Sequence, residues 1–211
     1  MKNKIVLSVL TLGLVGSTQA ANVATGSLWH VPEAISQNAT PANVPGTTPD
    51  VTFSVNSPFN FSGSDATVGT WLGSSSAFNI VENTPGTLAS QMDNNTQGSL
   101  LQFLGNVSVV NGQTFTVTHD DGLTLIIGGL DLGFNAGPTA PTVTTVTYTG
   151  PTGNFPFQLV YAECCQGPAV LQVDLPFVGT AVPETGSTLL LLGMGACGLI
   201  GFGRRYLGLQ S

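Results

Sequence analysis

Hydrophobic and polar positions alternate in short runs through the middle of this chain. In the run Thr114–His119, Phe115 and Val117 alternate with threonines, which is the period-2 pattern of a half-buried strand. Runs of this kind, rich in Val, Thr, Phe, Leu and Ile and separated by Gly, Pro, Asn and Ser, predict strands at Thr52–Val55, Val68–Leu72, Phe78–Val81, Leu100–Val110, Thr114–His119, Leu123–Ile127, Val143–Thr149, Phe157–Ala162 and Val170–Leu175. No helical stripe of useful length lies among them.

Turn signals separate these runs. Asn111-Gly112 predicts a tight hairpin between the strands on either side of it, and Asp121-Gly122 predicts a second turn. Many short strands with frequent turns are typical of an all-β fold, and we expect a β-sandwich of the jelly-roll kind or a barrel over residues 51–180. The stretch 21–50 is weakly patterned and is expected to be irregular. The apolar residues predicted to be mostly buried are Val117, Leu125, Ile127, Leu159, Tyr161, Val170 and Leu171.

Charge is scarce and divided along the chain. Only 7% of the 211 residues are charged, and the four basic residues Lys2, Lys4, Arg204 and Arg205 all lie at the ends. Ten of the eleven acidic residues lie in residues 21–183, a middle part that has no Lys or Arg. Such a part has no cations with which to neutralise phosphates, so nucleic-acid binding is not expected, and cations are its natural partners.

The first twenty residues have the three parts of a secretory signal. Lys2 and Lys4 give a positive start, Ile5 to Val15 is apolar, and Thr18-Gln19-Ala20 provides small residues at the outer positions of a cleavage site. We therefore expect export, with a signal helix over residues 1–20; a core helix with a basic start is the alternative.

The last residues also have three parts. Val182-Pro183-Glu184 precedes an apolar run, Ser187 to Gly203, and Arg204-Arg205 closes it. Seventeen helical residues rise roughly 25 Å, slightly less than the hydrocarbon core, and the arginines should remain cytoplasmic. This arrangement resembles the PEP-CTERM sorting signal, with Thr185 in place of the second proline. The resemblance implies residues 181–211 as a sorting and transmembrane segment, an exosortase as processing partner, and a Gram-negative host that makes exopolysaccharide. A plain single-pass anchor is the alternative.

A second resemblance concerns the middle of the chain. The stretch from Asn111 to Gly129, with Asp120-Asp121-Gly122 between two strands, resembles the core of a protective-antigen/flocculin-type (GLEYA adhesin-like) domain. Gly153 to Glu163 and Gly167 to Leu171 resemble that family's penultimate and final strands. The resemblance implies a β-sandwich that binds glycans, with calcium held by the paired aspartates.

The residues alone leave the role of Asp120 and Asp121 open. Adjacent carboxylates suit calcium, which takes six to eight oxygen ligands, but an aspartate also caps a turn by accepting backbone N–H groups. His119 adjoins the pair as a candidate sugar-contacting or supporting group, or as a surface side chain. Glu163 and Gln166, before the last strand, are candidate ligands that the family does not assign.

Cys164 and Cys165 are adjacent. We expect a vicinal disulfide in an oxidising compartment, with two reduced thiols as the alternative. Neither metal-type Cys or His spacing nor a Gly-x-Ser-x-Gly motif is present, so zinc and an esterase-type site are not indicated. The sequence thus predicts a non-enzymatic glycan-binding surface module. The alternatives are a structural biofilm or matrix protein without a ligand and, less favoured, a secreted hydrolase.

Overall fold

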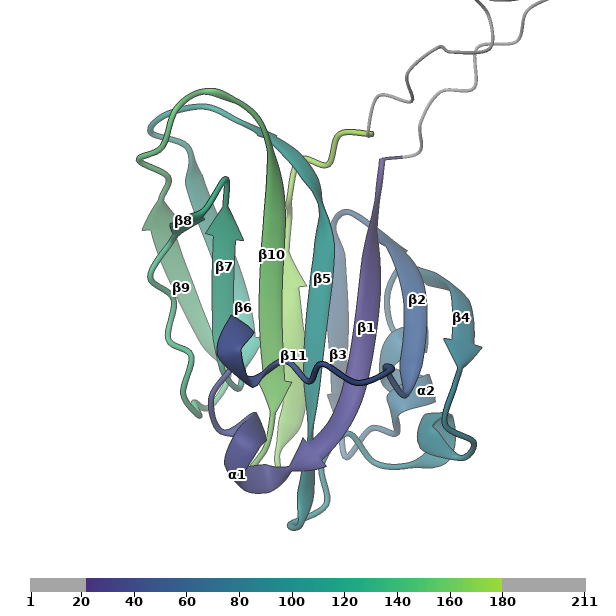
Figure 1. Cartoon of the computed structure of the whole chain (residues 1–211). Helices are drawn as coiled ribbons and strands as arrows, with labels where there is room; N and C mark the ends of the chain where they lie inside the picture. Colours follow the sequence, from purple (N-terminus) through teal and green to yellow (C-terminus); the bar gives the residue numbers. More distant parts are fainter. Residues whose placement is uncertain (1–21, 180–211) are drawn as a thin grey trace, which may run out of the picture. The chain divides into compact units, whose positions relative to one another are not determined.

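Two antiparallel β-sheets face each other in the computed structural model, which describes residues 22–179 (Figure 1). The larger sheet has the strand order β4-β2-β1-β5-β10-β7-β8, and the smaller sheet has the order β3-β11-β6-β9. The predicted signal peptide, the sorting residues Val182, Pro183, Glu184, Arg204 and Arg205, and the predicted transmembrane helix lie outside the described residues. Within residues 22–179, no helix is both long and apolar enough to cross a bilayer.

The strands of the larger sheet are β1 (Val23–Pro32), β2 (Val51–Asn56), β4 (Ala77–Glu82), β5 (Gln97–Val109), β7 (Leu123–Ile127), β8 (Leu130–Asp131) and β10 (Gly153–Glu163). Those of the smaller sheet are β3 (Phe59–Ser64), β6 (Thr114–Asp120), β9 (Thr142–Thr147) and β11 (Pro168–Val173). The helical elements are α1 (Glu33–Ser36), α2 (Val68–Gly73) and the 3-10 turns Pro41–Asn43 and Thr87–Ala89. The predicted all-β sandwich is confirmed.

The main core fills the space between the sheets. It is rich in aromatic rings: Phe103 lies 5.7 Å from Phe53 and 4.9 Å from Phe59, measured between ring centroids. Of the residues predicted to be buried, Val117, Leu125, Ile127, Leu159, Tyr161 and Leu171 are fully buried. Val170 is only partly buried, because it precedes Leu171 on one strand and adjacent strand residues face opposite sides.

The expectation that residues 21–50 are irregular is wrong for their first third. Residues Val23–Pro32 form β1, which pairs with both β2 and β5 inside the larger sheet. The remainder crosses the outer face of that sheet (Figure 1). There Trp29 donates from its indole nitrogen to the carbonyl of Thr47 at 3.1 Å, above a second small cluster of buried residues. Because β1 has covered positions on both faces, its sequence does not alternate simply.

The predicted strand Val68–Leu72 is a helix instead. Thr67 caps α2 by accepting the backbone N–H of Thr70 at 3.2 Å. Val68, Trp71 and Leu72 are buried, and this i, i+3, i+4 spacing is a helical stripe. Trp71 stacks on Phe61 at 4.3 Å and on Tyr161 at 5.7 Å. β3 was not predicted.

The Asn111-Gly112 turn does not close a hairpin. It connects β5 in the larger sheet with β6 in the smaller one, and β6 pairs with β9 and β11. The Asn111 side chain donates to the carbonyls of Thr149 and Gly150, and the backbone N–H of Gly112 donates to Tyr148. The turn therefore forms a corner of the sandwich, where both strands bury their apolar faces.

Candidate functional site

The Asp120–Asp121 corner lies beside the loop that follows β10. The corner connects β6 with β7, and the loop connects β10 with β11. Because β6 pairs with β11 and β7 pairs with β10, the strand registers bring both connections to one end of the sandwich, with Asp120 opposite Val170. The aspartates therefore lie beside the loop Glu163–Gly167, which carries the candidate ligands Glu163 and Gln166.

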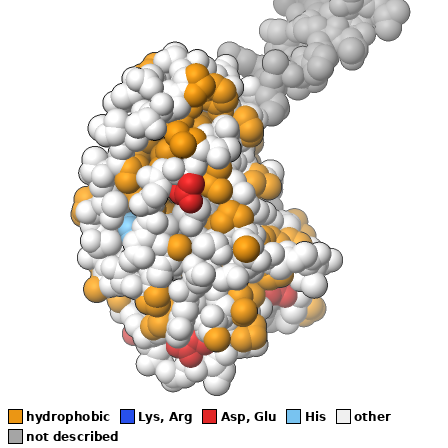
Figure 2. Space-filling model, turned by 60° about the vertical axis from the view of Figure 1, so that its left-hand side comes forward, with side chains coloured by type: hydrophobic (Ala, Val, Ile, Leu, Met, Phe, Trp, Pro, Cys, Tyr) orange, Lys and Arg blue, Asp and Glu red, His pale blue; other side chains and the backbone are white. Residues whose placement is uncertain are grey.

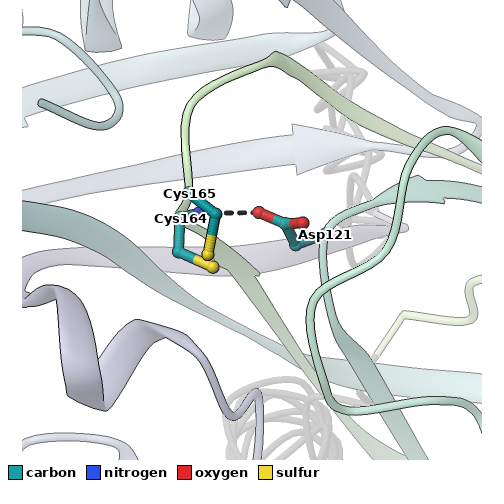
Figure 3. Close-up of side chains that lie close together, drawn as sticks. All are labelled: Asp121, Cys164 and Cys165. Atoms are coloured by element: carbon teal, nitrogen blue, oxygen red, sulfur yellow. Dashed lines mark hydrogen bonds between the residues drawn. The ribbon is translucent and has the colours of Figure 1, made fainter. Parts of the chain in front are cut away.

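Asp121 is anchored by backbone donors. Its Oδ2 atom accepts the N–H of Cys164 at 2.8 Å (Figure 3). Its Oδ1 atom accepts the N–H of Thr139 at 3.0 Å. These donors come from two segments that are distant in sequence. The carboxylate is therefore fixed in place while each oxygen keeps a second lone pair.

Asp120 faces a pocket of about 380 Å³, a volume within the range of small-ligand sites. Burial raises the pKa of Asp120 to about 7, and the neighbouring charge and hydrogen bond of Asp121 add to this. No Lys or Arg occurs in residues 22–179 to offset the two carboxylates. Residues from three segments line the pocket, among them Asp120, Asp121, Thr139, Cys165, Gln166 and Gly167.

His119 does not contact this pocket. Its side chain is fully buried, and Nδ1 lies 2.6 Å from the backbone carbonyl of Asp121. A carbonyl only accepts, so Nδ1 carries the proton and donates, while Nε2 lies 3.2 Å from the hydroxyl of Thr144. Of the three roles left open for His119, the structure agrees with the supporting one, because the ring is buried and holds the turn at Asp121, and it does not agree with an exposed surface side chain.

Glu163 also differs from the expectation. It is 2% exposed and its Oε2 atom lies 2.7 Å from the hydroxyl oxygen of Tyr161, whose hydroxyl also contacts the carbonyl of Asp120. Burial raises the pKa of Glu163 to about 9, and the charges of Asp121 and Asp120 act in the same direction. A buried carboxyl that holds its proton is a poor cation ligand, so Glu163 is not part of the aspartate pocket.

The loop itself separates two pockets. Gln166 and Gly167 line both the aspartate pocket and a second one of about 280 Å³, which Glu163 and Asp93 also line. Gln166 is exposed, and its backbone N–H donates to Asp93. Sequence reasoning did not single out Asp93; the only signal was its place in the turn-forming stretch Asp93-Asn94-Asn95.

The two cysteines are free thiols, so the predicted vicinal disulfide is absent. Adjacent Cα atoms lie about 3.8 Å apart, below the separations that disulfides prefer. Cys164 is buried and Cys165 is exposed. One ligand atom each from Asp121, Cys164 and Cys165 lies within 4.8 Å of the others, and Figure 3 shows this grouping. Burial raises the pKa of both thiols, which opposes the thiolate form that soft metals require.

The fold has counterparts among solved structures. A "PA14 sugar-binding domain from RTX adhesin" superposes with a TM-score of 0.51 at 18% identity, covering 76% of this chain and 91% of that one. The PA14 domain of the antifreeze protein MpAFP gives 0.50 at 17% identity, with 82% and 90% covered. At these identities the likeness concerns the fold. No protein-family model matches the sequence, and no curated protein matches it.

Proposed function

We propose that this chain is a non-enzymatic, calcium-dependent glycan-binding module of an exported cell-surface protein. The observation that carries the proposal is the buried pair Asp120–Asp121 in a pocket of a domain without cationic side chains. The shared fold with a PA14 sugar-binding domain supports the same reading.

Calcium fits the chemistry of this pocket. Two like charges side by side are unfavourable unless a cation or hydrogen-bond donors offset them. Asp121 has backbone donors, whereas the pKa of Asp120 near 7 shows that its charge is poorly compensated. Asp120 and Asp121 would hold the ion, with oxygens of the Gln166–Gly167 segment completing the site. Hard oxygen donors suit calcium better than the protonated thiols beside them suit a soft metal.

The loop position supports a role in glycan binding. A cation at the mouth of a pocket keeps coordination positions that sugar hydroxyls fill, and calcium commonly takes six to eight oxygens. The wall of the pocket comes from Thr139 and the β10–β11 loop, which lie on either side of the aspartates. We expect the sugar to bind only when the cation is present.

Calcium titration is the direct test. Melting temperature should rise with calcium, because a ligand that binds only the folded state stabilises it by RT ln(1 + [L]/Kd). Retention on a polysaccharide column should appear with calcium and disappear with EDTA. The double variant Asp120→Ala/Asp121→Ala should lose both effects. The matched control Glu82→Gln/Asp131→Asn removes two carboxylates that do not line the pocket and should keep both effects.

The competing function is a structural matrix protein without a ligand. Its threonine-rich strands and sparsely charged surface suit such a role. If about 10 mM calcium, roughly ten or more times the dissociation constant typical of extracellular sites, leaves the melting temperature unchanged, the aspartates only fix the turn. The structural role would then replace the binding role.

The sorting route belongs to the same proposal. The residues Val182-Pro183-Glu184, the apolar run and Arg204-Arg205 support processing by an exosortase, and residues 1–20 support export. Intact-mass spectrometry of the released protein should give an N-terminus at Ala21 and no residues beyond about Gly186. A matrix-fraction protein that keeps Met1 or the two arginines would contradict this route.

A further inference from the structure

β9 is an uncovered edge of the smaller sheet. One side of β9 pairs in continuous register with β6, from Thr114 opposite Thr147 to His119 opposite Thr142. Among the described residues, no backbone hydrogen bond reaches its other side. All six residues, Thr142–Thr147, are threonine or valine, and the strand has no charge, proline or bulge. Edge strands with these properties are templates for pairing with another strand.

Each of the other sheet edges among residues 22–179 has at least one feature that opposes pairing, although β4 also exposes Phe78, Ile80 and Val81. On β3, the N–H groups of Asn60 and Ser62 already donate to the hydroxyls of Ser75 and Ser74. β8 is two residues long and contains Asp131. β4 contains Glu82 and pairs with β2 through a shift in register. Short strands, carboxylates and bulges are all features that prevent edge pairing.

We propose that β9 pairs antiparallel with β9 of a second copy of this chain, which joins two four-stranded sheets into one. The distribution of charge favours this edge as the place where two copies meet. Residues 22–179 carry acidic side chains and no Lys or Arg, so two copies repel wherever carboxylates meet. An edge without charge allows contact, and the two-fold symmetry of a self-pairing strand closes the assembly as a dimer.

The side chains of β9 suit this pairing. Val143 is 65% exposed, although it is apolar, and it shares the outer face with Thr145 and Thr147. In an antiparallel pair centred on Thr145, Val143 of each copy lies opposite Thr147 of the other. Pairs of β-branched residues stabilise a sheet in this arrangement. Figure 2 turns this side of the molecule forward and shows hydrophobic and uncharged polar surface with only isolated acidic groups.

The experiment compares two lysine substitutions in the full chain. Thr145 and Thr116 are exposed neighbours on β9 and β6 whose hydroxyls hydrogen-bond at 2.9 Å. Thr145→Lys places a charge on the free edge, whereas Thr116→Lys places the same charge one strand away. Sedimentation velocity is measured at protein concentrations up to about 200 µM, because a single pair of strands forms a small interface, and small interfaces bind weakly.

The wild type and Thr116→Lys should form dimers, and Thr145→Lys should raise the dimer dissociation constant at least tenfold. Circular dichroism and melting curves establish that both variants remain folded. A wild type that stays monomeric throughout overturns the proposal, including the case in which another segment of the same chain covers β9. Dimers that persist unchanged in Thr145→Lys also overturn it, because association then uses another surface.

Discussion

The hydroxyl oxygen of Tyr161 lies 2.7 Å from Oε2 of Glu163, deep below the aspartate corner. The same hydroxyl contacts the backbone carbonyl of Asp120, which can only accept. Tyr161 has one proton to donate, so both contacts are satisfied together only when Glu163 is protonated and donates to the phenol oxygen. Burial raises the pKa of Glu163, against the lowering effect of the Tyr161 hydrogen bond, and so also favours the protonated carboxyl.

This arrangement predicts how stability depends on pH in the absence of calcium. The pKa of Glu163 rises from 4.5 to about 9 on folding, so the folded state binds the proton more tightly. The contribution of the Glu163 proton to the free energy of unfolding is complete below about pH 4.5 and is lost as pH rises toward 9. Glu163→Gln keeps a neutral donor beside Tyr161, and at pH 8 in EDTA it should be more stable than the wild type by at least about 1 kcal/mol.

Chemical denaturation at pH 5 and pH 8 measures this difference. The matched control is Glu82→Gln on the edge strand β4, which β2, β1 and β5 separate from β10, and it should follow the pH dependence of the wild type. If Glu163→Gln shows the same loss of stability between the two pH values as the wild type, Glu163 does not hold its proton in the folded protein.

Asp120 predicts a separate pH dependence for calcium. Because its pKa is about 7 in the free domain, protons and calcium compete for this carboxylate. Calcium affinity should be nearly constant above pH 8 and should be about thirtyfold weaker at pH 5.5, since each pH unit below the pKa costs about tenfold. Calorimetric titration at both pH values measures the ratio. Equal affinities would show that Asp120 is not a ligand.

The role of His119 is tested by its two hydrogen-bonding partners. His119→Phe leaves the buried carbonyl of Asp121 without its donor, which should cost roughly 1–3 kcal/mol of unfolding free energy. Thr144→Val removes only the weaker contact at Nε2 and should cost less. Denaturant unfolding of both variants gives the comparison. A larger loss in Thr144→Val would mean that Nε2, and not Nδ1, holds the ring in place.

Strand alternation was informative for Thr114–Asp120, which was predicted nearly to the residue because its apolar positions follow the buried face of the sheet. Leu123–Ile127 was predicted to the residue from its run of Leu, Thr and Ile between turn signals, although it is buried on both faces. β3 alternates in burial but was missed. β1 was missed because the segment crossing the larger sheet covers its outer face and removes the alternation. α2 was misread because a helix of six residues leaves too short a pattern to distinguish its stripe from a strand.

The candidate site was also only partly predictable from the sequence. Its central pair, Asp120–Asp121, and the nearby loop followed from the turn signal and a family resemblance. Part of the surroundings depends on contacts between distant segments, such as Asp93 with Gln166. The directions of Glu163 and His119 follow instead from strand alternation, because Glu163 is two residues after Tyr161 on β10 and His119 is two residues after Val117 on β6. Extending the two strands of the sequence prediction by their alternation would have placed both side chains on buried faces.

The two cysteines provide the last prediction. Cys165 is exposed, whereas Cys164 is buried and its pKa is raised, first by burial and then by the neighbouring thiol and Asp121. The thiolate is the reactive form, so iodoacetamide should modify Cys165 at least about tenfold faster than Cys164 in the folded protein, and both equally after denaturation. Peptide mapping by mass spectrometry, without prior reduction, distinguishes the two positions. A Cys165→Ser variant should leave Cys164 unmodified over the same time. If neither cysteine reacts in the native or the denatured protein until a reductant is added, the two thiols are joined as a vicinal disulfide.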